Sequence, residues 1–369
     1  MTSKVVLTVS ESDQQFGAHG RHKELVAGIA AKQLAQVIWI GPDPGLAGIE
    51  VVEVPCPAGN WVTRMFRRLR LARELSRVCR AVGNKSAIRL LTFSEPGLLI
   101  SSFARLPGVR RIHFIRADHL AASELLRQQT RNWLQHLRLR IAASNVRSLY
   151  RRARSRGTRF VVQTESFRQR LLALLGPDTD VAVVRNNCNR DSINEPRQVP
   201  STRPRRLLLV SNIHTTGKGI DLAIAALAQL DPEYTLTIVG DGEDLHLLRS
   251  EHGSNDRLSF LGSVENASRL MPEYDMLVAP SRLDAYPNVV LEGLWHRIPI
   301  VASDIEGHRA ILGEDFPLAP LTAAGLAQCI RRRAEDDEFN REILQLQELR
   351  RENHIFDWVA ECARELSLP

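Results

Sequence analysis

A lysine between two glycines is the first feature of the sequence that suggests chemistry. Lys218 stands in the run Gly217-Lys218-Gly219, after the apolar segment 206–210 and at the start of an amphipathic pattern over 218–230. We expect strand, turn and helix in that order, with the lysine beside the unpaired N–H groups of the helix N-terminus. Together they suit a diphosphate. The alternative is an exposed lysine beside a flexible turn.

Two acids eight positions apart are the second candidate. Asp284 lies in a loop after the predicted strand 276–279, and Asn288 is predicted to be the N-cap of a helix whose first turn carries Glu292. Carboxylates accept pairs of hydrogen bonds from hydroxyl groups, so this arrangement suits a sugar or a ribose. As isolated residues, the two acids would equally turn a loop and complement a helix dipole.

Weaker signals follow other predicted strands. Gly17 belongs to a loop of small residues, which either lets a phosphate approach the backbone or is an ordinary connection. Gly240 begins a Gly-Asp-Gly run that by itself indicates only a turn. His119 lies just past the end of a strand, where α/β sheets bind ligands, although a lone histidine there is more often structural than catalytic.

Short apolar runs alternate with helical patterns along the whole chain, and this alternation predicts the scaffold for these residues. It is typical of βαβ units, so we expect an α/β protein with parallel sheets. The predicted strands form two series, 4–9, 36–40, 88–93, 111–115, 160–163 and 181–184, then 206–210, 236–239, 258–260, 276–279 and 298–302. Residues 191–205 contain three prolines and no apolar periodicity, which predicts a linker between domains 1–190 and 206–350.

Charge is divided unevenly between the two halves. Residues 1–190 contain 31 Lys and Arg against 13 Asp and Glu, a net charge of +18, whereas residues 191–369 contain 18 against 29, a net charge of −11. A basic half predicts an anionic partner. Residues 61–82 place seven arginines around an apolar stripe, a pattern that favours an anionic membrane surface unless the stripe packs on the sheet. No stacking pattern or motif supports nucleic acid as a partner.

Several classes of protein are not expected. The five cysteines include no C-x-x-C pair, which argues against a zinc site or a disulfide scaffold. No G-x-G-x-x-G follows the first strand, and the run around Lys218 lacks the first glycine and the Ser/Thr of a Walker A loop. No segment reaches the roughly 18 apolar residues of a membrane span. We expect a cytoplasmic protein, peripheral at most on the inner face of the plasma membrane.

The order of these motifs along the chain resembles glycosyltransferase family 4. The matching series is Gly17, His119, Asn186-Asn187, Lys218-Gly219, Gly240-Asp241-Gly242, Phe260-Leu261-Gly262, Pro280-Ser281, and Asp284 with Glu292. The likeness is dense over residues 160–312 and loose before them. It implies the GT-B fold, in which two Rossmann-like domains face each other across a cleft. It also implies a retaining enzyme that needs no bound metal and no cofactor, its nucleotide sugar being a substrate.

The resemblance further implies a role for each matching residue. Lys218 corresponds to the lysine that holds the donor diphosphate, Asp284 to the acid near the donor sugar, and Glu292 to the acid that binds the ribose. His119 corresponds to a histidine near the reacting centre, and Gly17 to a glycine near the β-phosphate. The other implied donor contacts are Gly240, Asn212 and the backbone of Asn288, Val289 and Val290.

Three departures from the family pattern accompany the resemblance. Asn212 stands six residues before the lysine, where the family usually has an arginine. Arg185, Arg190 or Arg282 would then supply the charge. Asp284 replaces the commoner glutamate, and Gly17 is followed by alanine rather than by a second glycine.

We therefore expect a hexosyltransferase that moves a sugar, most simply from a UDP-sugar, to a glycan or lipid-linked acceptor in the biosynthesis of a cell-surface polysaccharide such as lipopolysaccharide. Domain 206–350 would bind the donor and domain 1–190 the acceptor. Residues 351–369 would contain a helix, over 353–368, that packs back on the first domain. Two alternatives are a non-transferring GT-B nucleotide-sugar epimerase and a binding protein built on the basic half.

Overall fold

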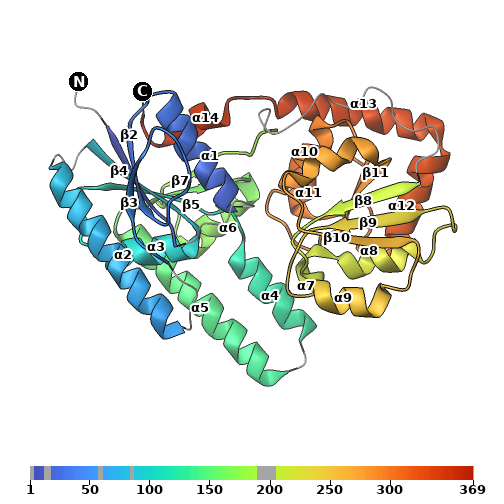
Figure 1. Ribbon diagram of the computed structural model, residues 1–369, viewed down its shortest axis with the longest axis horizontal. Helices are drawn as coiled ribbons and strands as arrows, with labels where there is room; N and C mark the ends of the chain where they lie inside the picture. Colours follow the sequence, from blue (N-terminus) through green and yellow to red (C-terminus); the bar gives the residue numbers. More distant parts are fainter. Residues whose placement is uncertain are drawn as a thin grey trace. The chain divides into compact units, whose positions relative to one another are not determined.

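The chain folds into two units, each built on a parallel β-sheet (Figure 1). The computed structural model describes residues 4–11, 18–56, 61–83, 87–130, 132–188 and 205–368. The first unit contains the chain as far as Arg185 and again from Asp357. The second unit contains Asn186–Phe356. The predicted linker therefore lies almost wholly outside the described residues.

The first unit has a seven-stranded sheet in the order β3-β2-β1-β4-β5-β6-β7, with every neighbouring pair parallel. Its strands are β1 (Val5–Val9), β2 (Gln36–Gly41), β3 (Glu50–Glu53), β4 (Ile88–Phe93), β5 (Arg110–Phe114), β6 (Arg159–Val162) and β7 (Val181–Val183). The chain adds strands on one side of β1 and then returns to add β4 on the other side. The topological switch point of this sheet therefore lies between β1 and β4.

Alternating side chains of β1 explain how helices cover both faces of this sheet. Leu7 belongs to the apolar cluster that includes Leu71 and Leu75 of one helix, whereas Thr8 faces the other way and contacts His22 of another at 2.5 Å. The helices of this unit are α1 (Ala18–Ala31), α2 (Trp61–Val82), α3 (Ser94–Phe103), α4 (His119–Gln129), α5 (Trp133–Ser155) and α6 (Glu165–Leu175).

The second unit has a five-stranded parallel sheet in the order β10-β9-β8-β11-β12. Its strands are β8 (Arg206–Val210), β9 (Thr235–Val239), β10 (Leu258–Gly262), β11 (Met276–Ala279) and β12 (Ile300–Ala302). The switch point here lies between β8 and β11. The helices are α7 (Thr215–Lys218), α8 (Ile220–Leu227), α9 (Leu245–His252), the 3-10 helix η2 (Ala267–Glu273), α10 (Asn288–Trp295), α11 (Glu306–Leu312), α12 (Ala323–Glu335) and α13 (Asp337–Asn353).

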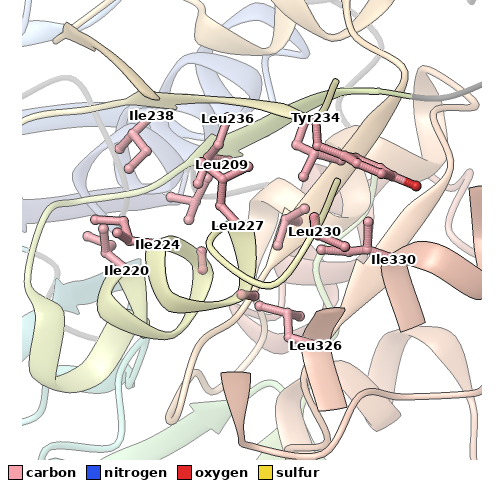
Figure 2. Close-up of a cluster of buried hydrophobic side chains, with 14 of the residues drawn as sticks. Leu209, Ile220, Ile224, Leu227, Leu230, Tyr234, Leu236, Ile238, Leu326 and Ile330 are labelled. Atoms are coloured by element: carbon pink, nitrogen blue, oxygen red, sulfur yellow. The ribbon is translucent and has the colours of Figure 1, made fainter. Parts of the chain in front are cut away.

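One of the apolar core clusters of the second unit lies between β8 and β9 and the helices α8 and α12 (Figure 2). Aliphatic side chains recur every three or four residues on α8, so one face of that helix is buried against the sheet. The side chains labelled in the figure are Leu209, Ile220, Ile224, Leu227, Leu230, Tyr234, Leu236, Ile238, Leu326 and Ile330. This packing holds β8, and with it the loop that carries Lys218.

The second sheet's first helix and the first sheet's edge strand differ from the predicted elements. The helix expected over 218–230 is broken at Gly219, whose φ of 64° lies in the left-handed region, so Lys218 ends the short helix α7 instead of opening a longer one. Strand β3 was not predicted, because its four residues Glu-Val-Val-Glu carry a weak apolar signal at the edge of the sheet.

The last helix, α14 (Trp358–Glu365), belongs to the first unit and packs against α1. It is shorter than the helix expected over 353–368, because α13 continues to Asn353 and Asp357 then caps α14 by accepting a hydrogen bond from the amide of Ala360 at 3.0 Å. Gly28 of α1 leaves room for this contact, since a Cβ there would lie 2.5 Å from a methyl group of Val359.

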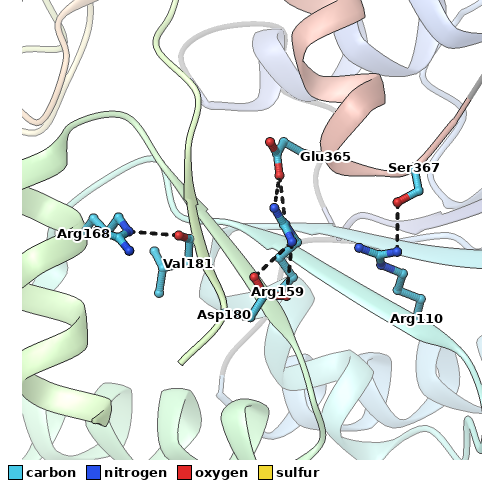
Figure 3. A network of polar contacts seen from close by, with 7 residues as sticks. All are labelled: Arg110, Arg159, Arg168, Asp180, Val181, Glu365 and Ser367. Carbon is cyan, nitrogen blue, oxygen red and sulfur yellow. Dashed lines mark hydrogen bonds and ion pairs between the residues drawn. The ribbon is translucent and has the colours of Figure 1, made fainter. Parts of the chain in front are cut away.

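Arginines at the amino ends of the first sheet's strands fasten the end of the chain (Figure 3). Arg159 of β6 donates to Glu365 at 2.9 Å and also pairs with Asp180 at 3.0 Å. Arg110 of β5 donates to the hydroxyl of Ser367 at 2.8 Å. The C-terminal segment is thus an integral part of the first unit.

Candidate active site

Two loops of the second unit start from neighbouring strands at its switch point. β8 and β11 pair in parallel, with Leu207 opposite Met276, so their carboxyl ends lie side by side. From there the chain continues toward opposite edges of the sheet. Open α/β sheets bind ligands at such a point, outside the carboxyl ends of the strands.

Backbone contacts hold the two loops together. The carbonyl of Gly217 accepts hydrogen bonds from the amides of Arg282 at 2.9 Å and Leu283 at 3.2 Å. A Cβ on Gly219 would lie 2.1 Å from the carbonyl oxygen of Pro280, so only glycine allows this approach, and its left-handed φ requires glycine as well. The loop after β8 and the loop after β11 therefore form one structure.

This structure brings two of the predicted site residues into contact. Nζ of Lys218 lies 2.5 Å from Oδ2 of Asp284, and both side chains are partly buried. The pair is a salt bridge between two loops that only the sheet topology brings together. A diphosphate at this point would compete with Asp284 for the lysine, which makes the contact an exchangeable one.

Helix α11 packs against the Asp284 loop and carries a buried histidine, His308, that was not predicted. A Cβ on Gly307 would lie 2.1 Å from the carbonyl oxygen of Asp284, so α11 packs directly against this loop. The next residue, His308, is fully buried, and its Nδ1 lies 2.7 Å from the carbonyl of Ser303. Burial lowers the pKa of His308, although the hydrogen bond to Ser303 acts against the shift. The ring is therefore neutral, with Nδ1–H as donor.

The residues predicted on α10 differ in their surroundings. Asn288 is the first helical residue and Pro287 the N-cap, so the prediction that Asn288 caps the helix is wrong; its amide oxygen instead accepts a hydrogen bond from Asn186 at 2.9 Å. Glu292 lies in the second turn rather than the first, half-buried. Val289 is also half-buried, whereas Val290 is a core side chain.

The amide of Val290 is already engaged in the structure. It donates to the carbonyl of Pro287 at 3.2 Å, within the turn that opens α10. The donor contacts implied for the backbone at Asn288 and Val289 stay predictions, and the one implied for Val290 would have to replace this hydrogen bond.

Asn212 and Gly240 lie in adjoining loops of the second unit. Asn212 is exposed, and its carbonyl accepts a hydrogen bond from the Ser211 hydroxyl at 2.9 Å. Gly240 has a φ of 141°, and a Cβ there would lie 1.8 Å from the carbonyl oxygen of Ser211. Close packing of the loops after β8 and β9 therefore explains why this position is a glycine. Its implied contact with the donor stays a prediction.

The three arginines expected to supply the missing charge differ in their surroundings. Arg282 makes a two-pronged contact with Asp221, at 2.7 and 2.6 Å, so its charge is already balanced. Arg185 is exposed at the end of the first unit. Arg190 lies outside the described residues, as does Gly17.

His119 belongs to the first unit, where it opens α4 just after β5. Its Nε2 lies 2.9 Å from Oε2 of Glu95, which also accepts a hydrogen bond from the Tyr150 hydroxyl at 2.6 Å. Glu95 was not predicted, although like His119 it follows a predicted strand, 88–93.

Comparison with known proteins adds to this geometry. Residues 204–336 match the family Glycosyl transferases group 1. The matched segment contains Lys218, Asp284 and Glu292. It covers the second sheet and most of its helices, and it ends directly after α12.

Curated relatives align over short parts of the chain. The lipopolysaccharide core biosynthesis glycosyltransferase LpsE of Rhizobium meliloti is 29% identical over 126 residues, 32% of this chain and 37% of the relative. The O-antigen biosynthesis glycosyltransferase WbnH of Escherichia coli is 33% identical over 84 residues, 23% of this chain and 25% of the relative. The phosphatidyl-myo-inositol mannosyltransferase of Mycobacterium leprae is 27% identical over 156 residues, 40% of this chain and 41% of the relative. The chain thus spans less than half the length of these relatives.

Solved structures resemble the chain over its full length. Anabaena Alr3699/HepE, in complex with UDP and glucose, has a TM-score of 0.76 at 17% identity and 99% coverage of both chains. WaaG, a glycosyltransferase involved in lipopolysaccharide biosynthesis, has a TM-score of 0.75 at 16% identity, covering 98% of this chain and 99% of the other. These likenesses confirm the predicted GT-B fold, two parallel-sheet α/β domains. With the family match they support a glycosyltransferase, whereas membership of family 4 stays a prediction.

Proposed function

We propose that this protein is a retaining, metal-independent glycosyltransferase that moves a sugar from a nucleotide-sugar donor, a UDP-sugar, to a glycan or lipid-linked acceptor. The observation that supports this most is the contact between Lys218 and Asp284 at the switch point between β8 and β11. A cation and a carboxylate are held there, at the ligand-binding end of the sheet, inside the segment that matches the family.

The chemistry proposed for the site follows from these groups. The bond between C1 of the sugar and the diphosphate oxygen breaks, and a bond from C1 to the acceptor oxygen forms on the same face. The proton of the acceptor hydroxyl ends on the leaving nucleoside diphosphate. Lys218 leaves Asp284 and stabilises the charge that develops on the diphosphate. Asp284 then accepts hydrogen bonds from hydroxyl groups of the sugar, and Glu292 holds the ribose.

The relatives support the choice of donor and acceptor. HepE is described in complex with UDP and glucose, which favours UDP as the nucleotide. LpsE and WbnH are named for lipopolysaccharide core and O-antigen biosynthesis, which favours a cell-surface glycan as the product.

Two measurements test this function. A thermal-shift panel of UDP-, GDP-, ADP- and CMP-sugars identifies the donor, because a ligand that binds the native state raises Tm. Incubation of the labelled donor with a crude lipid extract then separates the candidates. We expect labelled product in the lipid fraction. An isomerised free sugar would indicate the epimerase instead, and stabilisation by none of the nucleotide sugars would contradict a donor site.

A membrane surface is the proposed location of the acceptor, and α2 contributes less to it than its sequence predicts. Leu71 and Leu75, with the rest of the C-terminal part of the stripe, are buried against the sheet, so for that part the packing alternative is correct. Arg68 makes two 2.8 Å contacts with Glu11. Only the first turns expose apolar side chains, chiefly Phe66, which is 68% exposed.

Helix α5 offers the stronger surface. Its first half exposes four large apolar side chains at positions that share one face, Trp133, Leu134, Leu137 and Ile141, with exposures of 70, 48, 47 and 52%. The helix contains six arginines and no acidic residue. A basic helix with an exposed apolar stripe suits the headgroup layer of an anionic membrane, where each basic residue contributes about 1 kcal/mol.

None of the helices in the described residues is both long and apolar enough to span a bilayer. Sedimentation with vesicles tests the surface. Phosphatidylcholine vesicles with anionic phosphatidylglycerol should bind the protein in a salt-sensitive manner, and pure phosphatidylcholine should not. The double variant Trp133→Ser/Leu137→Ser should lose binding, whereas Leu247→Ser, on the 54%-exposed leucine of α9, should keep it. Binding that ignores the α5 substitutions, or no binding to either vesicle, would contradict this location and leave the enzyme proposal untouched.

A further inference from the structure

A carboxylate, a histidine and a tyrosine meet at the ligand-binding end of the first sheet. Glu95 lies in the first turn of α3, directly after β4, the strand beside the switch point. His119 is the first residue of α4, after the neighbouring strand β5. The turn into α3 is sharp, because Ser94 has a φ of 64°, an uncommon conformation for a residue other than glycine. This turn places the Glu95 carboxylate over the strand ends, beside the histidine.

The contacts of Glu95 use both of its oxygens. Oε1 accepts the hydrogen bond from Tyr150 at 2.6 Å, and Oε2 lies 2.9 Å from Nε2 of His119. Tyr150, on α5, is 2% exposed, so its packing in the core holds the hydroxyl against the buried oxygen of the carboxylate. The His119 side chain is 49% exposed, so the ring has one nitrogen on Glu95 and a face open to solvent.

The charges around the cluster favour a protonated histidine. The hydrogen bond to Glu95 raises the pKa of His119 in spite of partial burial, with the charges of Glu95 and Asp118 acting in the same direction. Burial alone would raise the pKa of Glu95, but His119 and the Tyr150 hydrogen bond bring it below its usual value. Burial lowers the pKa of the nearby His113 to about 4, so this histidine stays neutral.

The remaining groups do not reverse this balance. Asp118 is itself paired with Arg170 at 3.2 Å and caps α4 by accepting from Ala121. Burial and the charge of Glu95 raise the pKa of Tyr150 well above its usual value, so the phenol keeps its proton and remains the donor. The N-terminal end of α4 disfavours a positive ring. The hydrogen bond to Glu95 acts in the opposite direction.

We propose that Glu95 and Tyr150 are positioning residues that hold the His119 imidazolium by Nε2, so that its Nδ1–H is presented to an oxygen of a substrate at the ligand-binding end of the first sheet. The inference rests on the proposed function. It extends that function by adding two residues, neither of which is in the matched segment, and by giving the histidine a charge and a direction. A simple surface ion pair would need neither a buried tyrosine on the second oxygen nor a place at the ligand end of the sheet.

Titration of His119 in the full-length, donor-free protein tests the arrangement directly. The protein is labelled with ¹³C-histidine, and the His119 signal is assigned by its loss in His119→Gln. We expect Glu95→Gln to lower the pKa of His119, because the amide keeps the hydrogen-bond acceptor and removes the charge. Glu124→Gln, an exposed carboxylate on the same helix that pairs with Arg127, is the matched control and should leave the titration unchanged.

Turnover of the donor identified by the thermal-shift panel provides the second readout. A lower pKa for a group that must be protonated lowers kcat on the alkaline side, by the factor that the measured titration shift predicts, and leaves it near wild type on the acidic side. Structural damage would lower kcat at every pH. Tyr150→Phe keeps the buried ring and removes the hydroxyl. It should lower kcat severalfold while the pKa of His119 stays raised.

Each outcome bears on one proposal. Unchanged His119 titration in Glu95→Gln, or a loss of kcat in Glu95→Gln that is equal at all pH values, would overturn the positioning role. If Glu95→Gln fails to fold, full activity of Tyr150→Phe would overturn it as well. If no nucleotide sugar raises the Tm of the wild type, the proposed function is contradicted, whatever the titration of His119 shows.

Discussion

Nζ of Lys218 and Oδ2 of Asp284 lie 2.5 Å apart, so the only lysine after residue 85 is paired with an acid from the neighbouring loop. The two residues are 66 positions apart in the sequence. Because both are partly buried, the pair is screened less than a fully exposed salt bridge. Binding of an anionic ligand at the lysine therefore has to displace Asp284, and this relationship leads to the first two predictions.

Replacement of Lys218 should remove most of the transfer. In Lys218→Ala we expect kcat to fall about 10²-fold or more, the scale of losing one contact to charge that develops in the transition state. Steady-state kinetics at saturating donor measure this. Lys23→Ala, a lysine of the first unit whose ammonium donates to the backbone carbonyl of Pro44 at 3.2 Å, is the control. Near-wild-type turnover in Lys218→Ala would contradict its assignment to the diphosphate.

Asp284→Asn should separate binding from turnover. Without the competing carboxylate, Lys218 is available to a diphosphate, so free UDP should bind more tightly while kcat falls. Calorimetric titration with UDP measures the first effect and kinetics the second. Asp221→Asn, which removes the partner of Arg282, is the matched control. Weaker UDP binding together with unchanged kcat would show that Asp284 acts on the nucleotide and not on the sugar.

Glu292→Gln should behave differently from the Asp284 variant. A ribose contact is made equally in the ground state and the transition state, so its loss should raise the donor KM with little change in kcat. Donor saturation curves measure both constants. A fall in kcat at unchanged KM would place Glu292 at the reacting sugar instead.

Two glycines in the Lys218 loop should respond in opposite ways to alanine. Gly219→Ala combines a left-handed φ with a Cβ placed 2.1 Å from the carbonyl oxygen of Pro280, so the two loops must separate. We expect a lower Tm and loss of UDP binding. Gly217→Ala meets no atom within 4 Å and is the matched control. Equal effects of the two substitutions would mean that the loop contact contributes nothing to the site.

Acid should destabilise the first unit through His113. Burial lowers the pKa of this histidine to about 4, although Glu95 and the contact with Thr92 act against the shift. An unfolded histidine titrates near 6.5, so between about 6.5 and 4 the unfolded state binds more protons and stability falls as the pH falls. Calorimetric scans from pH 7 to pH 4.5 should show a smaller decrease in Tm for His113→Gln than for the wild type. Parallel decreases would contradict the neutral buried ring.

The arrangement of the strands was largely predictable from the sequence, and the residue contacts were not. Parallel strands buried on both faces are recognisable as short apolar runs, which is why β8 and β11 were placed correctly to within a residue. Strand β3 was missed because it pairs with a single neighbour and is only half-buried. The break at Gly219 was missed because an amphipathic period runs through it and a single glycine does not reveal its φ.

The candidate site was predictable where it depended on local order and not where it depended on distant contacts. Lys218 and Asp284 were predicted from the loops in which they lie, and the order of the motifs along the chain favoured a functional role for both. Their mutual contact depends on the strand order, which spacing does not determine. The contact of Tyr150 with Glu95 joins residues 55 positions apart, and a tyrosine inside an arginine-rich helix gives no signal of it.

The return of residues 357–368 to the first unit has a consequence for how the protein is made. Trp358 lies against the guanidinium groups of Arg21 and Arg116, at 5.2 and 5.7 Å from the ring centre, and Cys362 is completely buried. During synthesis the first unit emerges from the ribosome early, yet it lacks these side chains until the rest of the chain has been translated. The second unit, being continuous, can finish folding first. A recombinant fragment that ends at residue 190 would expose the apolar surface that α14 covers, and would need α14 added as a separate peptide or joined through a short linker.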